Sequence, residues 1–103
     1  MKKISRSKNS VATQRTRIDA LDKKIIALIA QRLKIACKIA QEKKRLNLTI
    51  RQPERMASLL AERKKMALTH TLNPAFILKV YKIILDESMK IQKRQLAKKH
   101  EHF

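Results

Sequence analysis

The chain has 103 residues and carries 26 Lys and Arg against 8 Asp and Glu, a net charge of +18. It contains no glycine, two prolines, no tryptophan and 3% aromatic residues, whereas 44% of its residues are hydrophobic. One folded domain is expected at this length, and the apolar content argues against a disordered tail. Hairpins, β-sandwiches and glycine-rich phosphate loops need residues with positive φ, so the lack of glycine argues against all three. The composition therefore predicts an all-α protein.

Charge and cysteine usage indicate the partners and the compartment. The charge of +18 favours anionic partners, from nucleic acid to a small dianion. Cys37 is the only cysteine, so no internal disulfide can form, which fits a reducing compartment. No apolar run has the length of a signal peptide or of a membrane span. We therefore expect a cytoplasmic protein without a membrane partner.

The first half of the chain is expected to form one long helix. Residues 1–13 are basic, polar and without periodicity, and we interpret them as a flexible N-terminal arm. Between residue 14 and about residue 45, apolar residues recur every three or four positions. This spacing is typical of an amphipathic helix with one apolar stripe.

Two prolines mark the starts of the remaining helices. Pro53, followed by an acidic residue, predicts a second helix that ends near His70. The pair Asn73-Pro74 combines a good N-cap with a good first helical residue, which predicts the start of a third helix. The polar tail 98–103 is expected to fray. The helical domain would then span residues 14–97.

The length of the first helix predicts a homodimer. A helix over residues 14–45 would be roughly 48 Å long, whereas a compact domain of this size has a radius of gyration near 13 Å. Its apolar stripe continues along the whole helix, so the protruding half needs a cover. The same helix of a second chain, related by two-fold symmetry, provides the simplest cover.

Several polar residues occupy positions on these apolar faces. Arg32 lies in the stripe of the first helix, and Lys43 and Arg15 extend the same stripe in both directions. Ser88 and Gln92 lie one turn apart on the inner face of the third helix. Because burying an unpaired guanidinium is costly, an anion bound near Arg32 would offset that cost.

Each of these residues also has a purely structural interpretation. Arg32 could extend its charge to solvent or pair with a buried acid, and Gln92 could fix the register of a helical bundle. Lys43 begins a run of three basic residues that is typical of a solvated surface. The histidines and Cys37 show no spacing typical of a metal site or a nucleophile, so we expect neither metal nor cofactor.

Taken in order, these segments resemble the all-helical class of chorismate mutase. The resemblance covers roughly residues 14–95 and is spread over all three expected helices. No single piece is distinctive, but the ordered series at matching spacing is specific. The segments that carry it are Arg15-Thr-Arg-Ile-Asp-Ala-Leu-Asp22, Ile25-Ile-Ala-Leu-Ile-Ala-Gln-Arg32, Ile39-Ala-Gln-Glu-Lys43, Arg51-Gln-Pro-Glu-Arg55, Leu72-Asn-Pro-Ala-Phe-Ile77 and Glu87-Ser-Met-Lys-Ile-Gln92.

The resemblance implies a three-helix protomer in an intertwined homodimer with two identical sites. By this resemblance, Arg32 and Arg15 would hold the two carboxylates of chorismate, with Arg15 supplied by the other subunit. Lys43 would donate to the ether oxygen and to a carboxylate, and Gln92 would donate to the ether oxygen from the opposite side.

The resemblance further implies that Arg55 and Ser88 lie at the second carboxylate. Gln52 stands where the family often has Asp, near the substrate hydroxyl. Met56 stands where the family commonly has Glu, which accepts a hydrogen bond from that hydroxyl. Met56 cannot accept it, so an isochorismate pyruvate-lyase of the same fold, or a mutase acting on an amino-substituted chorismate, is an alternative.

The reaction implied is a pericyclic rearrangement of chorismate to prephenate, which needs no proton transfer, covalent intermediate or metal. The protein has to hold the reactive conformer and to stabilise charge on the ether oxygen. A basic helical nucleic-acid binder is the alternative of another class, but it does not explain Arg32 within an apolar stripe. A regulatory homologue without catalysis is a further alternative, for which Met56 would be the reason.

Overall fold

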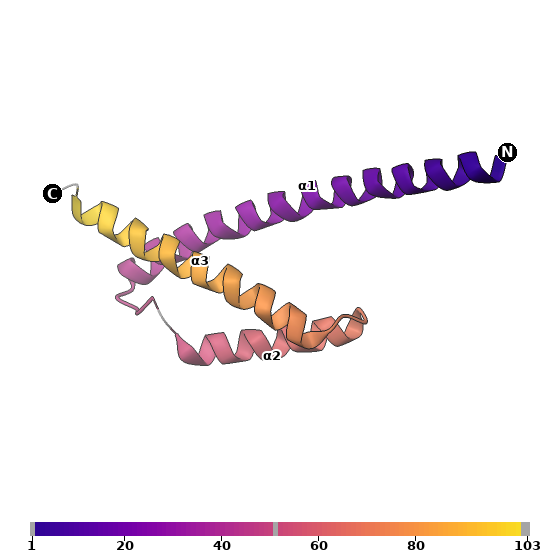
Figure 1. Ribbon diagram of the computed structural model, residues 1–103. Coiled ribbons are helices and arrows are strands. Elements are labelled where there is room, and N and C mark those ends of the chain that lie inside the picture. The colour runs from indigo at the N-terminus through magenta and orange to yellow at the C-terminus, as the bar shows by residue number, and fades with distance from the viewer. Residues whose placement is uncertain (1, 51, 102–103) are drawn as a thin grey trace. The chain divides into compact units, whose positions relative to one another are not determined.

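The computed structural model describes the backbone of residues 2–50 and 52–101 and the side chains of residues 10–50 and 52–97. These residues form three helices and no strand: α1 (Lys2–Arg45), α2 (Pro53–Thr69) and α3 (Pro74–Glu101) (Figure 1). The all-α prediction is therefore confirmed, as are the end of the first helix and the starts of the other two. None of the described helices has an apolar stretch long enough to cross a membrane.

Both outer ends of the helices extend beyond the predicted limits. The helix α1 begins at Lys2 rather than at residue 14, and α3 continues to Glu101 through the first residues of the predicted tail. Neither segment contains a glycine or proline to stop a helix, and Lys, Arg, Gln and Ala are good helix formers. The division into arm, domain and tail stays a prediction.

The helix α1 and the helix α2 both end in a Schellman motif built without glycine. At the end of α1, the amide of Leu48 donates to the carbonyl of Lys43, and Asn47 has φ of 59°. At the end of α2, the amide of Leu72 donates to the carbonyl of Ala67, and Thr71 has φ of 57°. Glycine is the usual residue here, so a β-branched threonine at positive φ stores strain.

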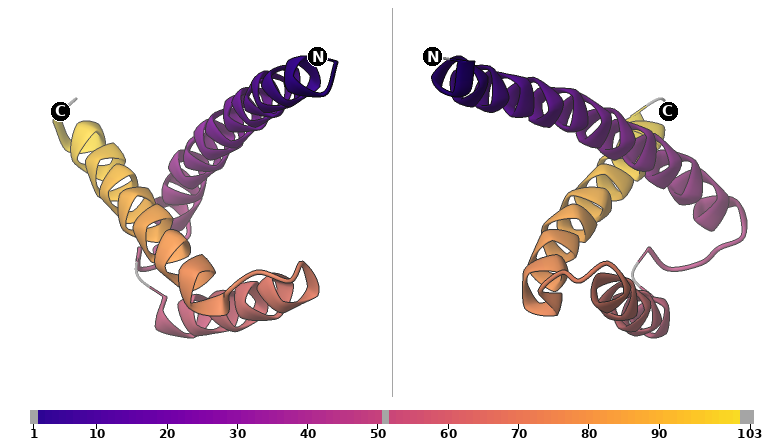
Figure 2. Two further views of the ribbon diagram at one scale, coloured as in Figure 1. Left: turned by 45° about the vertical axis from the view of Figure 1, so that its right-hand side comes forward. Right: turned by 90° about the vertical axis from the view of Figure 1, so that its right-hand side faces the viewer.

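The chain divides into two compact units, residues 1–32 and residues 33–103. Within the second unit, α2 and α3 pack against each other as a helical hairpin (Figure 2). Its buried apolar residues are Ala36, Ala40, Leu59, Ala67 and Leu85. Two polar residues, Ser88 and Gln92, are buried with them.

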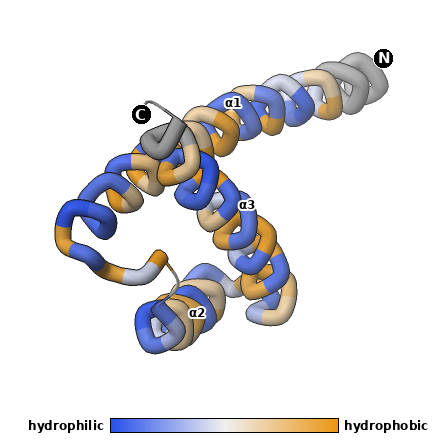
Figure 3. The backbone as a smooth tube through the Cα atoms, turned by 90° about the vertical axis from the view of Figure 1, so that its left-hand side faces the viewer, coloured by the Kyte–Doolittle hydropathy of each residue, from blue (hydrophilic) through white to orange (hydrophobic). Residues whose placement is uncertain are grey.

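The first unit consists of one stretch of α1. Every described residue from 10 to 31 is exposed, and Arg32 is half-buried. Both hydrophobic and hydrophilic residues recur along the coloured part of this helix (Figure 3). The large apolar residues of its stripe, such as Ile25 and Leu28, are 51% and 61% exposed. The homodimer that would cover them stays a prediction.

Candidate active site

Lys43 and Gln92 contact each other in the second unit, 49 positions apart in the sequence. The Nζ atom of Lys43 donates to the Oε1 atom of Gln92 at 3.2 Å and to the carbonyl oxygen of Ile50 at 2.5 Å. These two acceptors fix the ammonium between the last turn of α1, the following loop and α3. The residues predicted to act on the same substrate atom therefore lie side by side.

Burial distinguishes Lys43 from the other lysines whose side chains the structure describes, all of which are exposed. Its side chain is half-buried, and the loss of hydration that follows lowers the pKa of its amine from the usual 10.5. A partly desolvated cation interacts more strongly with a nearby anion than a fully solvated one does. Lys43 is thus suited to bind an anionic group rather than only to increase solubility.

Gln92 is held in one orientation by its lysine partner. The residue is 8% exposed, so few arrangements of its amide are possible. An ammonium group can only donate, which means that the amide oxygen faces Lys43 and the Nε2 group faces away. Gln92 is therefore prepared to donate a hydrogen bond to a further acceptor.

Ser88 lies one turn before Gln92 on the same side of α3. It is 4% exposed, and its hydroxyl donates to the carbonyl oxygen of Ile84 at 2.9 Å. The prediction that Ser88 and Gln92 lie on the inner face of the third helix is confirmed. Together with Lys43 they form a polar cluster inside an otherwise apolar core, which we call the Lys43 cluster.

The first turn of α2 carries the other residues predicted near the substrate. Gln52 is the N-cap residue, and its side chain makes no capping hydrogen bond. Arg55 is exposed and Met56 is half-buried.

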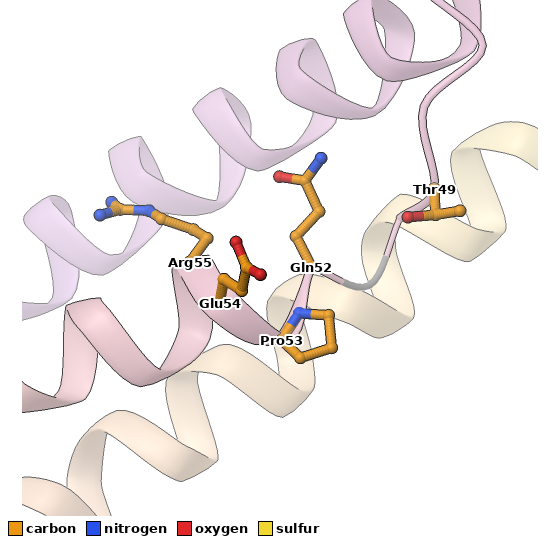
Figure 4. A pocket seen from close by; sticks show the side chains of 5 residues that line it. All are labelled: Thr49, Gln52, Pro53, Glu54 and Arg55. Atoms are coloured by element: carbon orange, nitrogen blue, oxygen red, sulfur yellow. The ribbon is translucent and has the colours of Figure 1, made fainter.

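An open hollow of about 550 Å³ lies at this turn. It is lined by Thr49, Gln52, Pro53, Glu54 and Arg55. The side chains of Gln52 and Glu54 extend to the same side of the chain, away from the ring of Pro53 (Figure 4). The hollow contains two of the predicted residues, Gln52 and Arg55, but its lining does not include the Lys43 cluster.

Sequence reasoning missed three contributors to these sites. The carbonyl of Ile50 holds Lys43, and Thr49 and Glu54 line the hollow. A backbone carbonyl leaves no signal in a sequence, because every residue has one. The side chains of Thr49 and Glu54 could have been suspected, since both flank the predicted start of the second helix.

The two remaining predicted residues, Arg15 and Arg32, belong to the first unit. Arg15 is exposed on α1, and Arg32 is half-buried. Among the described residues, no group of three or more His, Cys, Asp or Glu side chains could hold a metal ion.

Comparisons with known proteins identify a family. The sequence model of the family "Chorismate mutase type II" matches residues 14–93. A chorismate mutase of Methanocaldococcus jannaschii is 30% identical over 84% of this chain and 87% of its own length. A bifunctional chorismate mutase/prephenate dehydratase of Buchnera aphidicola subsp. Schizaphis graminum is 35% identical over 89% of this chain and 24% of its own length.

A third relative is named for a modified substrate. The 4-amino-4-deoxychorismate mutase of Streptomyces pristinaespiralis is 29% identical over 81% of this chain and 64% of its own length. The chain spans about a quarter of the length of the bifunctional relatives that it matches.

Proposed function

The chain belongs to the chorismate mutase type II family, and we propose that it converts chorismate to prephenate by an intramolecular pericyclic rearrangement. The observation that best supports this function is the hydrogen bond of 3.2 Å between Lys43 and Gln92. The reaction breaks an ether bond, and its oxygen gains negative charge in the transition state. The ammonium of Lys43 is a suitable donor to such an oxygen, and the Nε2 group of Gln92 can supply a second donor.

Preorganisation explains how so few groups could accelerate the reaction. Lys43 is held by the carbonyl of Ile50 before any substrate binds, and Gln92 is held by Lys43. Donors that are already oriented need little rearrangement when charge develops, so their stabilisation is specific to the transition state. In this proposal Gln92 donates through its Nε2 group, which faces away from Lys43.

Arginines would hold the two carboxylates of the substrate. A guanidinium binds a carboxylate through two parallel hydrogen bonds, which fixes both position and orientation. We assign this role to Arg32 and to Arg15 of a second chain, with Arg55 and Ser88 at the second carboxylate. Holding both ends of a flexible dianion favours its folded, reactive conformer.

The dimer is part of the proposal because the first unit has no cover of its own. All of its described residues up to residue 31 are exposed, including a continuous apolar stripe. Burial of each large apolar side chain is worth about 1.5–3 kcal/mol, so association of two such stripes is strongly favoured. Pairing of α1 with α1 of a second chain, related by two-fold symmetry, would also bring Arg15 of one chain toward the site of the other.

The substrate's ring substituent is the open part of the proposal. Gln52 and Met56 stand where the family commonly has carboxylates, so the groups that would accept a hydrogen bond from a ring hydroxyl are altered. A relative named for an amino-substituted chorismate supports a mutase on that substrate as a second candidate. The pyruvate-lyase alternative differs in its products, which are salicylate and pyruvate.

Product identification tests the function directly. The purified protein is incubated separately with chorismate, 4-amino-4-deoxychorismate and isochorismate, and the products are separated by chromatography. We expect prephenate from chorismate as the fastest reaction. Turnover of the amino analogue alone would support the second candidate, and salicylate with little prephenate would overturn the mutase proposal. No product from any substrate would indicate a non-catalytic homologue.

A further inference from the structure

The outward side of α3 carries four lysines that the proposed site does not use. They are Lys79, Lys82, Lys90 and Lys93, and all four are exposed. We call this set the lysine face. It belongs to the second unit, on the helix that also carries Ser88 and Gln92, but those two residues are buried whereas the lysines are in solvent.

The spacing of the lysine face places its charges on one side of the helix. Lys79 and Lys82 are three positions apart, as are Lys90 and Lys93. Each lysine of the first pair is followed eleven positions later by one of the second pair. Eleven residues complete about three helical turns and a rise of about 16 Å, so the two pairs point in nearly the same direction.

No acidic partner neutralises these lysines within the described side chains. The ion pairs there are Arg45–Glu42, Arg63–Glu62 and Arg94–Glu87, and none includes the lysine face. Asp86, between the two pairs, is the acidic residue on this side of α3. Because like charges three positions apart on a helix repel each other, an anion bound at the lysine face would relieve the repulsion within each pair.

We propose that the lysine face binds the phosphate backbone of double-stranded nucleic acid without sequence preference. Two pairs of cations separated by about 16 Å match an extended polyanion better than a single small anion. Lysine supplies compact, mobile point charges, which suit phosphates and carry no readout of bases. The net charge of +18 would attract such a partner from a distance.

Other macromolecules fit this face less well. Protein interfaces are enriched in aromatic residues and arginine and are depleted in lysine, which is the reverse of what the lysine face offers. Single strands are bound largely by stacking on aromatic rings, and the chain has 3% aromatic residues. Binding of nucleic acid does not explain why Arg32 lies in an apolar stripe, which is why the sequence alone disfavoured it. The lysine face is a surface separate from Arg32, so binding of chorismate and binding of nucleic acid are compatible.

The test compares two variants with the same loss of charge. The first changes Lys79, Lys82, Lys90 and Lys93 to Gln, and the control changes the exposed Lys34, Lys38, Lys64 and Lys65 to Gln. Binding of a fluorescein-labelled duplex DNA of about 25 base pairs is followed by anisotropy over a series of KCl concentrations. Circular dichroism establishes that both variants keep the helicity of the unmodified chain.

The expected result is a difference between the two variants. Loss of four phosphate contacts reduces the slope of log K against log salt by about 3–4 and weakens binding at low salt at least about tenfold. The control should lose no more than about threefold. Equal losses would mean that net charge alone drives binding and would overturn the proposal.

The identity of the partner is tested in the same assay. Poly-glutamate and vesicles containing anionic lipid compete with the labelled duplex. Displacement by unlabelled duplex at lower concentration than by either competitor supports the proposal. No binding of the duplex, or stronger binding of poly-glutamate or vesicles, would overturn it. These outcomes are independent of turnover of chorismate, so they do not depend on the proposed enzyme function.

Discussion

The two units of the chain differ in how they could be stable. In the second unit, Leu59 and Leu85 are 4% and 9% exposed, and the unit contains its own core. In the first unit, no described residue is buried, although its apolar stripe is as regular as that of any core helix. A single helix with no packed face is marginal in water. The comparison teaches that the first unit needs another surface, whereas the second unit has a small core of its own.

The residues of the proposed site are distributed over both units. The groups proposed as donors to the ether oxygen, Lys43 and Gln92, lie in the second unit, where two hydrogen bonds hold them. The arginines assigned to the carboxylates, Arg15 and Arg32, lie in the first unit. Activity should therefore need association of chains even though the Lys43 cluster forms within one chain.

The largest effect is expected from a change in the Lys43 cluster. Gln92→Ala should lower kcat about 100-fold and leave KM almost unchanged, because the ether oxygen gains charge only in the transition state. Steady-state kinetics with chorismate measure both constants. Ser88→Ala is the matched control, since it removes a hydroxyl from the adjacent turn and should cost less. A loss confined to KM would contradict the role assigned to Gln92.

A pair of leucine variants sharpens the comparison between the units. Leu59→Ala in the core of the second unit should lower the free energy of unfolding by about 2–4 kcal/mol. Leu28→Ala in the exposed stripe should instead weaken association of chains, so its thermal midpoint should depend more strongly on protein concentration. Calorimetry at several protein concentrations distinguishes a loss of core stability from weakened association of chains. An effect of Leu28→Ala below about 0.5 kcal/mol at every concentration would indicate that the stripe stays in solvent.

The pH profile tests the state of Lys43. Burial favours the neutral amine, so the pKa of Lys43 lies below 10.5. The protonated form is the proposed donor, and kcat/KM should therefore fall as pH rises through that lowered pKa, approaching about tenfold per pH unit. In Lys43→Arg, any remaining activity should show no such fall. A profile for the unmodified chain that is flat up to pH 10.5 would contradict this assignment.

The smallest effect concerns the turn after α2. Thr71 has φ of 57°, and Thr71→Gly should raise the free energy of unfolding by about 1 kcal/mol because glycine adopts this conformation without strain. Asn47→Gly is the control and should gain less, since asparagine tolerates positive φ. Chemical denaturation measures both variants. A destabilised Thr71→Gly variant would show that the threonine side chain contributes more than its backbone strain costs.

Periodicity and proline placement predicted much of the fold. The stripe of α1, the start of α2 at Pro53 and the cap of α3 follow from local rules. The backbone amide of Ala75 indeed donates to the Oδ1 atom of Asn73 at 2.9 Å. The start of α1 and the end of α3 were not predicted correctly. Neither segment contains a glycine or proline, and the absence of such helix-breaking residues is a weaker signal than their presence. Positive φ at Thr71 could not be foreseen, because tertiary and turn constraints overrode its preference.

The burial of two polar side chains was predictable from the sequence, whereas the backbone partner of Lys43 was not. Ser88 and Gln92 on an apolar face indicated a buried polar cluster, and both are buried. The carbonyl of Ile50 as the second partner of Lys43 had no counterpart in the sequence pattern. The residues at the start of α2 were anticipated individually, but the pattern did not predict that they line a hollow of their own.

The most direct test of the shared site mixes two inactive variants. Arg15→Ala and Arg32→Ala chains should each lose most turnover of chorismate while keeping the helicity of the unmodified protein. After unfolding and refolding together, half of the dimers are heterodimers, and one of their two sites contains both arginines. The mixture should recover about a quarter of the original activity. Recovery at that level would support a site completed by a second chain, and no recovery above the separate variants would contradict it.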